Sequence, residues 1–253
     1  MPSASALRIK IEHSLESRFP AALTPMPRTF RETASTGIPA VDALLDGGLP
    51  VGAISELTGP ASSGRTSLAL AFLAHRTHEE SVCAWVDAGD AFDPESAAAC
   101  GVCLSRLLWV RCRDAGRIRP ETPWSRLDQA LRATDLLLQA GGFSALVLDL
   151  GSTAPEHGCR IPLATWFRFR QAADRTRCSL VVLGQSAFAQ SSAAVVLECA
   201  PLEPATRGGS VLTGFTYQIR RGRQRFTASI AGQRKPPASH WLASGAWERE
   251  RSA

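Results

Sequence analysis

The chain reads Gly-Pro-Ala-Ser-Ser-Gly-Arg-Thr at residues 59–66, and this stretch decides the fold. Its spacing is that of the phosphate loop G-x-x-x-x-G-K-[ST]. In that motif, backbone N–H groups at a helix N-terminus hold phosphate oxygens, a lysine reaches the β- and γ-phosphates, and a hydroxyl binds Mg²⁺. Arg65 stands in the place of the lysine. Because the planar guanidinium is not equivalent to a compact ammonium, we predict a loop that holds a phosphate but handles the γ-phosphate poorly.

The residues on either side of the loop predict a strand and a helix. Residues 53–58 alternate between apolar and polar side chains, and residues 66–75 are rich in alanine and leucine. Strand, turn and helix in this order is the context that the motif requires. A chance glycine- and serine-rich loop stays open as the alternative. We predict that nine consecutive residues bind the phosphates: Gly59, Pro60, Ala61, Ser62, Ser63, Gly64, Arg65, Thr66 and Ser67.

Beyond the loop, apolar strands alternate with helices. Strands are predicted at residues 82–87, 107–110, 145–150 and 180–185, and helices at residues 38–45, 94–100, 123–140 and 162–176. Continuous apolar strands between helices favour an α/β fold with a mostly parallel sheet covered on both faces. The strand-favouring sequence at residues 194–230 predicts antiparallel strands at one edge of this sheet. We divide the chain into an N-terminal helix and linker (1–32), a core domain (33–230) and a poorly ordered C-terminal tail (231–253).

Composition limits the class of protein. A chain of 253 residues with 45% hydrophobic residues suits one α/β domain with short appendages. Its N-terminus lacks the apolar stretch of a signal peptide, so we expect a cytoplasmic protein that does not enter a membrane. A net charge of +5 permits an acidic partner such as nucleic acid without requiring one. The seven cysteines are expected to be free thiols, and the lone pair Cys100 and Cys103 is a poor candidate for a metal site.

Two further side chains extend the candidate site. Asp149 ends an apolar strand, and in phosphate-loop enzymes such an acidic residue binds Mg²⁺ through water. We therefore predict Thr66 and Asp149 as the Mg²⁺ ligands, although many parallel strands end in aspartate for structural reasons alone. Gln185 lies at the tip of the next strand, where its amide can approach the γ-phosphate and sense it.

From about residue 33 to residue 225, the sequence resembles the bacterial recombinase RecA. The segments that carry the resemblance are residues 35–37 with Asp42, 47–52, 59–66, 84–94, 208–209 and 220–225. The resemblance implies a RecA-like P-loop core that takes ATP and Mg²⁺. It also implies that Asp149 is the Mg²⁺-associated aspartate and that Gln185 is the glutamine that links the nucleotide state to DNA binding.

The departures from this family concern catalysis and DNA. Gly89 stands where the family has its catalytic glutamate, and the neighbouring Asp90 is a shorter and displaced substitute for a base. Residues 186–194, in the region of a DNA-binding loop, contain no lysine or arginine. Together with Arg65, these departures are similar to those of the ImuA proteins, RecA-like accessory factors of error-prone translesion synthesis.

That similarity implies a role in the DNA-damage (SOS) response with weak or no ATPase activity. The implied partners are RecA, an ImuB-like homologue of the Y-family polymerases and a DnaE-type polymerase. The alternative is an active DNA-dependent ATPase or recombinase of the RecA family. A RecA-like regulator of signalling or division is a third reading that the sequence does not separate from the first.

Two segments are candidates for contacts with macromolecules. Residues 5–19 predict an amphipathic helix that binds partner proteins or, equally, folds back onto the core. Basic residues late in the chain predict weak, sequence-independent binding of single-stranded DNA, the alternative being a solvated or protomer-facing edge. These residues are Arg207, Arg220, Arg221, Arg223, Arg225, Arg234 and Lys235.

Overall fold

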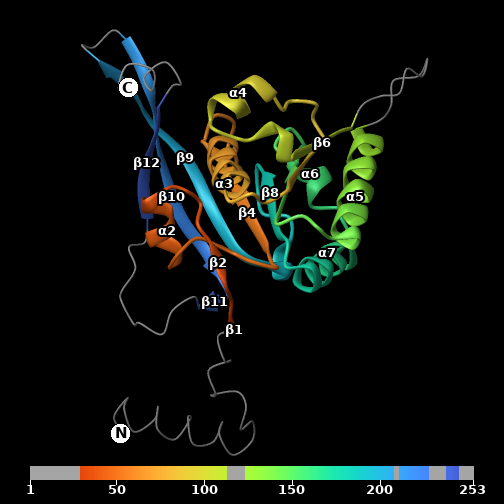
Figure 1. Cartoon of the computed structure of the whole chain (residues 1–253). Coiled ribbons are helices and arrows are strands. Elements are labelled where there is room, and N and C mark those ends of the chain that lie inside the picture. The colour runs from red at the N-terminus through yellow and green to blue at the C-terminus, as the bar shows by residue number, and fades with distance from the viewer. Residues whose placement is uncertain (1–28, 113–122, 208–210, 228–237, 245–253) are drawn as a thin grey trace, which may run out of the picture.

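An eight-stranded sheet forms the centre of the computed structural model, which describes residues 29–112, 123–207, 211–227 and 238–244 (Figure 1). Its strand order is β12-β10-β9-β4-β8-β7-β5-β6. The strands are β4 (Ile54–Thr58), β5 (Cys83–Asp87), β6 (Leu107–Arg111), β7 (Ala145–Asp149), β8 (Ser179–Gly184), β9 (Ala193–Arg207), β10 (Val211–Gln224) and β12 (Ala238–Ser244). The run from β9 to β6 is parallel, whereas β10 and β12 are antiparallel additions at one edge. The predicted fold class is confirmed.

Helices cover both faces of this sheet and create two cores. They are α2 (Pro39–Leu45), α3 (Arg65–His78), α4 (Pro94–Ala99), α5 (Pro123–Ala140), α6 (Pro155–Gly158) and α7 (Leu163–Thr176). One core joins α2, α3 and α4 to strand residues such as Trp85 and Val147, and the other joins α5 and α7 to the alternate residues Val86 and Leu148. Since successive side chains of a strand point to opposite faces, both must be apolar here, which explains the continuous apolar runs in the sequence.

Short elements complete the fold. Strand β1 (Thr29–Phe30) pairs with β11 (Phe226–Thr227), and β2 (Thr33–Ala34) pairs with β3 (Leu49–Pro50). Two 3₁₀ turns, η1 (Leu104–Arg106) and η2 (Gln190–Ser192), precede β6 and β9. In the described part of the chain, no helix is long and apolar enough to cross a membrane, and no cluster of three or more histidine, cysteine or acidic side chains is arranged to hold a metal ion.

The structure differs from the sequence prediction at the C-terminal end. Residues 238–244 lie in the tail predicted to be poorly ordered, but they form β12, and Trp241 is buried beside its neighbour Tyr217 of β10. The ring centroids of this pair are 5.1 Å apart. The run is too short to be recognised by itself, and it forms because β10 offers an edge and an aromatic partner. The predicted helix at residues 5–19, Arg234 and Lys235 lie outside the described residues.

Candidate functional site

The phosphate loop, residues 59–66, connects β4 to α3, as the motif predicted. Gly59, Ser62 and Gly64 adopt positive φ angles of 150°, 59° and 85°. A Cβ atom on Gly59 would lie 2.2 Å from the carbonyl oxygen of Cys199, and one on Gly64 would lie 2.6 Å from the ring of Tyr217. Both positions therefore require glycine for conformation and for space. Strands β9 and β10 pack directly against the loop and hold its shape.

Two buried polar atoms of the loop have no hydrogen-bond partner among the described residues. They are Oγ of Ser63, a residue that is 1% exposed, and Nη1 of Arg65, a residue that is 9% exposed. A buried donor without an acceptor costs about 1–3 kcal/mol. Phosphate oxygens would accept hydrogen bonds from both groups at the N-terminus of α3. These residues therefore fit a bound phosphate.

The carboxyl ends of three neighbouring strands bring the other predicted residues to the loop. In the sheet, β8 lies between β4, which carries the loop, and β7, which ends at Asp149. Gln185 directly follows β8, and its Nε2 donates a hydrogen bond to the carbonyl oxygen of Gly151 at 3.3 Å. The N–H of Gly59 donates to the carbonyl oxygen of Gly184 at 3.3 Å. Asp149, Gln185 and the loop thus share one edge of the sheet.

The guanidinium of Arg65 lies beside the carboxylate of Asp149. A Cβ atom placed on Gly151 would be 3.0 Å from Oδ1 of Asp149 and 3.5 Å from Nη2 of Arg65. Oδ1 already accepts a hydrogen bond from the N–H of Gly151 at 2.8 Å. Burial lowers the pKa of Arg65, and the negative charge of Asp149 opposes that shift.

The carboxylate of Asp149 is in an unfavourable electrostatic environment. Burial, reinforced by the neighbouring Asp87, raises its pKa to about 6, although the N–H of Gly151 and the charge of Arg65 lower it. A carboxylate and the exposed hydroxyl of Thr66 are ligands that suit Mg²⁺. However, the guanidinium already stands beside this carboxylate, so a second cation would meet a like charge. The residues fit a phosphate well and a metal ion poorly, and the proposed Mg²⁺ ligands stay a prediction.

The position of the expected catalytic base has no side chain, and Ser152 lies against it. A Cβ atom on Gly89 would lie 2.3 Å from Oγ of Ser152 and 3.1 Å from its Cβ. Asp90 is held by Arg111 of β6, whose Nε donates to Oδ1 at 2.7 Å. In the sheet, β8, β7 and β5 lie between β4, which carries the phosphate loop, and the edge strand β6. The hydrogen bond to Arg111 of β6 therefore holds Asp90 on the side away from the loop. Asp90 is not brought to the phosphate loop.

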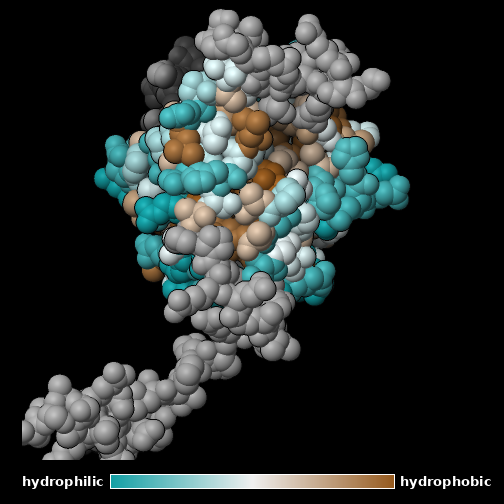
Figure 2. Space-filling model, turned by 90° about the vertical axis from the view of Figure 1, so that its left-hand side faces the viewer, coloured by the Kyte–Doolittle hydropathy of each residue, from teal (hydrophilic) through white to brown (hydrophobic). Residues whose placement is uncertain are grey.

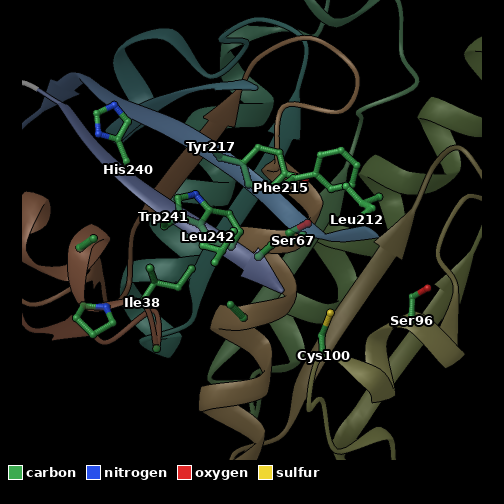
Figure 3. A pocket seen from close by; sticks show the side chains of 16 residues that line it. Ile38, Ser67, Ser96, Cys100, Leu212, Phe215, Tyr217, His240, Trp241 and Leu242 are labelled. Carbon is green, nitrogen blue, oxygen red and sulfur yellow. The ribbon is translucent and has the colours of Figure 1, made fainter. Parts of the chain in front are cut away.

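An apolar cavity of about 870 Å³ adjoins the loop. Ser67, which follows the loop, and Tyr217, whose ring covers Gly64, both line it. Figure 3 shows Leu212, Phe215 and Tyr217 in a row along β10, with Ser67 beside them and Cys100 further along the cavity wall. Strand β12 adds Trp241 and Leu242, which the sequence prediction missed.

The same face carries exposed apolar side chains. Leu212, Phe215 and Leu242 are each more than 40% exposed. Figure 2, which views the side of β12 and α2, shows apolar patches separated by polar surface. This combination of a hollow, aromatic rings and apolar surface beside a phosphate loop is typical of a site for a flat organic ring.

The segment after β8 is tied to the sheet by a residue that sequence reasoning missed. Glu56 of β4 is 1% exposed, and its Oε1 accepts hydrogen bonds from the N–H groups of Phe188 and Ala189 at 2.6 and 2.8 Å. Burial raises the pKa of Glu56, and the two backbone N–H groups oppose that shift. Because β4 also carries Ser55 and Thr58, no local pattern of the sequence distinguished Glu56 and signalled this contact.

Arginines of the late basic run also bind this segment and its surroundings. Arg223 donates to the carbonyl oxygen of Gln190, and Arg225 donates to that of Ser191 at 2.9 Å. Arg221 donates to the carbonyl oxygen of Leu44 at 3.4 Å. Three of the arginines predicted as DNA contacts therefore bind backbone carbonyls of their own chain, which favours the structural alternative for them.

Comparisons with known proteins agree with this geometry. The family model described as "RecA N-terminal domain" matches residues 9–156. Protein RecA of Allorhizobium ampelinum is 34% identical over 169 residues, which are 61% of this chain and 43% of that protein. Protein RecA of Brucella canis is 33% identical over 169 residues, 61% of this chain and 44% of that protein. The chain thus spans less than half the length of these relatives.

A solved structure shares the fold. The crystal structure of the RadB recombinase aligns with a TM-score of 0.56, 18% sequence identity, and coverage of 83% of this chain and 94% of that one. At this identity, the likeness concerns the fold alone.

Proposed function

The chain belongs to the RecA N-terminal domain family, and from this premise we propose that it binds a nucleotide with weak or no hydrolysis. In this proposal it acts as a RecA-like accessory protein of the DNA-damage (SOS) response and of error-prone translesion DNA synthesis. The role belongs to the cytoplasm, where DNA and the replication machinery of a bacterium lie.

One observation carries the proposal: residue 89 has no side chain, and Oγ of Ser152 lies 2.3 Å from the point where a Cβ atom would be. A general base must lie within hydrogen-bond reach of the attacking water and contributes about 10²–10⁴-fold to the rate. A serine hydroxyl is not a base at neutral pH, and Asp90 is engaged by Arg111. With no base in place, turnover should fall to a small fraction of that of a complete enzyme.

In this proposal, the nucleotide binds across the phosphate loop and the cavity beside it. Its phosphates would bind the loop through backbone N–H groups, Ser63 and Arg65, and its base would enter the adjoining apolar cavity. Phe215 and Tyr217 offer ring faces there, with centroids 6.3 Å apart. ATP is the ligand that the family resemblance suggests for this site.

Direct contact with DNA is a minor part of the proposal. Glu56 ties down the segment that replaces a DNA-binding loop, and that segment has no basic side chain. Recruitment to damaged DNA would then depend on protein partners, namely RecA, an ImuB-like polymerase homologue and a DnaE-type polymerase. Weak, non-specific binding of single-stranded DNA remains part of this proposal.

The second candidate function is an active DNA-dependent ATPase or recombinase. The observation that favours it is the contact between Gln185 and the turn after Asp149, because the glutamine is placed to respond to a bound nucleotide. Thr66 and Asp149 also keep their positions at the ends of α3 and β7.

Two measurements separate these functions. Steady-state ATP hydrolysis by the pure full chain, with and without single-stranded DNA, should stay near background. Robust DNA-stimulated turnover would select the second function.

A pull-down with RecA and the two polymerases should capture the chain, and deletion of residues 1–30 should abolish capture while the core stays folded by circular dichroism. Capture that survives the deletion would place the interface elsewhere.

A further inference from the structure

Arg65 lies near Asp149, the strand-end acid that in phosphate-loop enzymes is associated with the metal ion. Nη2 of Arg65 and Oδ1 of Asp149 both lie within 4 Å of a single point beside Gly151. In an ordinary site of this kind the metal ion bridges the β- and γ-phosphates, close to the acidic residue at the end of the strand. Here a cation that belongs to the chain lies near that acidic residue, and its charge lowers the pKa of the carboxylate.

The guanidinium of Arg65 keeps a hydrogen-bond donor that the surrounding protein does not satisfy. Arg65 is 9% exposed, and its Nη1 is buried without a hydrogen-bond partner among the described residues. A guanidinium offers five N–H donors in a rigid fork, which suits phosphate oxygens. The unpaired Nη1 and the unpaired Oγ of Ser63 belong to the same loop, and in the proposed site both would donate to the bound phosphate.

We propose that the guanidinium of Arg65 replaces Mg²⁺ beside Asp149, so that the site binds a metal-free nucleoside diphosphate in preference to a magnesium-bound triphosphate. The inference rests on the proposed function, namely that the loop binds a nucleotide. Arginine supplies the positive charge that the β-phosphate needs. Its bulk lies where the γ-phosphate and the metal ion would otherwise meet Asp149, which disfavours a triphosphate.

Replacement of Mg²⁺ by a guanidinium would explain why Arg65 and Asp149 occur together in this chain. A lysine would leave the carboxylate open to a metal ion, whereas the wider guanidinium screens it. Replacing Arg65 by lysine should therefore restore dependence on Mg²⁺. Replacing Asp149 by asparagine in that variant should remove the dependence again.

The test is isothermal titration calorimetry of the full chain with ADP and with ATP, in Mg²⁺ and in EDTA. The wild-type dissociation constant for ADP should be the same within about twofold in both buffers, and ADP should bind about tenfold more tightly than ATP. In Arg65→Lys, Mg²⁺ should improve ATP binding by about tenfold or more, and Arg65→Lys/Asp149→Asn should lose that gain. Circular dichroism confirms that each variant is folded.

Arg65→Gln is the matched control, because it keeps hydrogen-bond donors on a shorter side chain without the charge. It should lose ADP binding in both buffers. Wild-type binding that requires Mg²⁺ would overturn the inference but leave the proposed nucleotide site standing. Wild-type protein that binds neither nucleotide in either buffer would overturn both. Arg65→Gln that binds ADP as tightly as the wild type would also overturn the inference.

Discussion

Restoring a glutamate at residue 89 is expected to displace the side chain of Ser152. The first atom of any side chain at this position would lie 2.3 Å from Oγ and 3.1 Å from Cβ of Ser152. Contacts this short force Ser152 to move. Its exposed hydroxyl can rotate away but its Cβ stays close, so the cost should lie at the low end of the about 1–3 kcal/mol typical of overpacking. Residue 89 is not among those with a positive φ angle, so its backbone accepts a side chain. The penalty of Gly89→Glu should therefore come from Ser152 and disappear in Gly89→Glu/Ser152→Gly.

Urea unfolding of four proteins measures this penalty as a coupling free energy. They are the wild type, Gly89→Ala, Ser152→Gly and the corresponding double variant. The alanine variant adds only the Cβ atom, so it isolates the steric effect from any effect of a new charge. We expect a coupling of about 1 kcal/mol or more, with the double variant close to Ser152→Gly alone. Equal destabilisation by Gly89→Ala in the presence and absence of Ser152 would refute the reasoning.

The same substitutions carry a consequence for catalysis. Gly89→Glu/Ser152→Gly in an Arg65→Lys background supplies a base, the space for it and the lysine of the motif. A positioned base contributes about 10²–10⁴-fold to a rate, so ATP turnover should rise clearly above that of the Arg65→Lys protein. Arg65→Lys/Gly89→Glu, which retains Ser152, is the matched control and should gain less.

The remaining predictions concern pH, the segment after β8 and DNA. Because the pKa of Asp149 is raised to about 6, the folded state holds this proton more tightly than the unfolded chain. Stability is therefore lost as pH rises from about 4 to about 6, by about 3 kcal/mol, and unfolding curves of Asp149→Asn should lack this loss. Glu56→Ala leaves two buried N–H groups unpaired and should cost about 2–4 kcal/mol and speed amide exchange at residues 188 and 189, whereas Glu56→Gln keeps the acceptor oxygen and should cost less. Arg223→Glu/Arg225→Glu should lower stability and leave oligonucleotide anisotropy unchanged across a salt series; a shallower salt slope would instead assign both arginines to DNA phosphates.

The sequence was sufficient to predict the sheet and the meeting of the loop with two distant residues. Parallel strands such as β7 and β8 are apolar on both faces, so they are visible without their partners, and their carboxyl ends share one edge. That rule alone places Asp149 and Gln185 near the loop. It operates through backbone topology, which the apolar pattern encodes strongly.

The details that decide chemistry depend on contacts between segments far apart in the chain. Ser152 is an ordinary loop serine until the turn after β7 brings it against Gly89. Glu56 reads as one polar residue in an alternating strand until the segment at residues 188–189 folds over it. Strand β12 depends on the exposed edge of β10. None of these contacts has a local pattern, so they follow only from the packed structure.

The three departures from a complete RecA-type site are each accommodated by the surrounding structure, and this bears on how the site is interpreted. Here Ser152 lies against Gly89, Glu56 holds the segment after β8, and the guanidinium of Arg65 lies near Asp149. Oγ of Ser63 and Nη1 of Arg65 are the exceptions in the loop, since both are buried without a hydrogen-bond partner among the described residues. A remodelled site whose loop keeps two unpaired donors for a phosphate is the arrangement expected if binding was retained after turnover was lost.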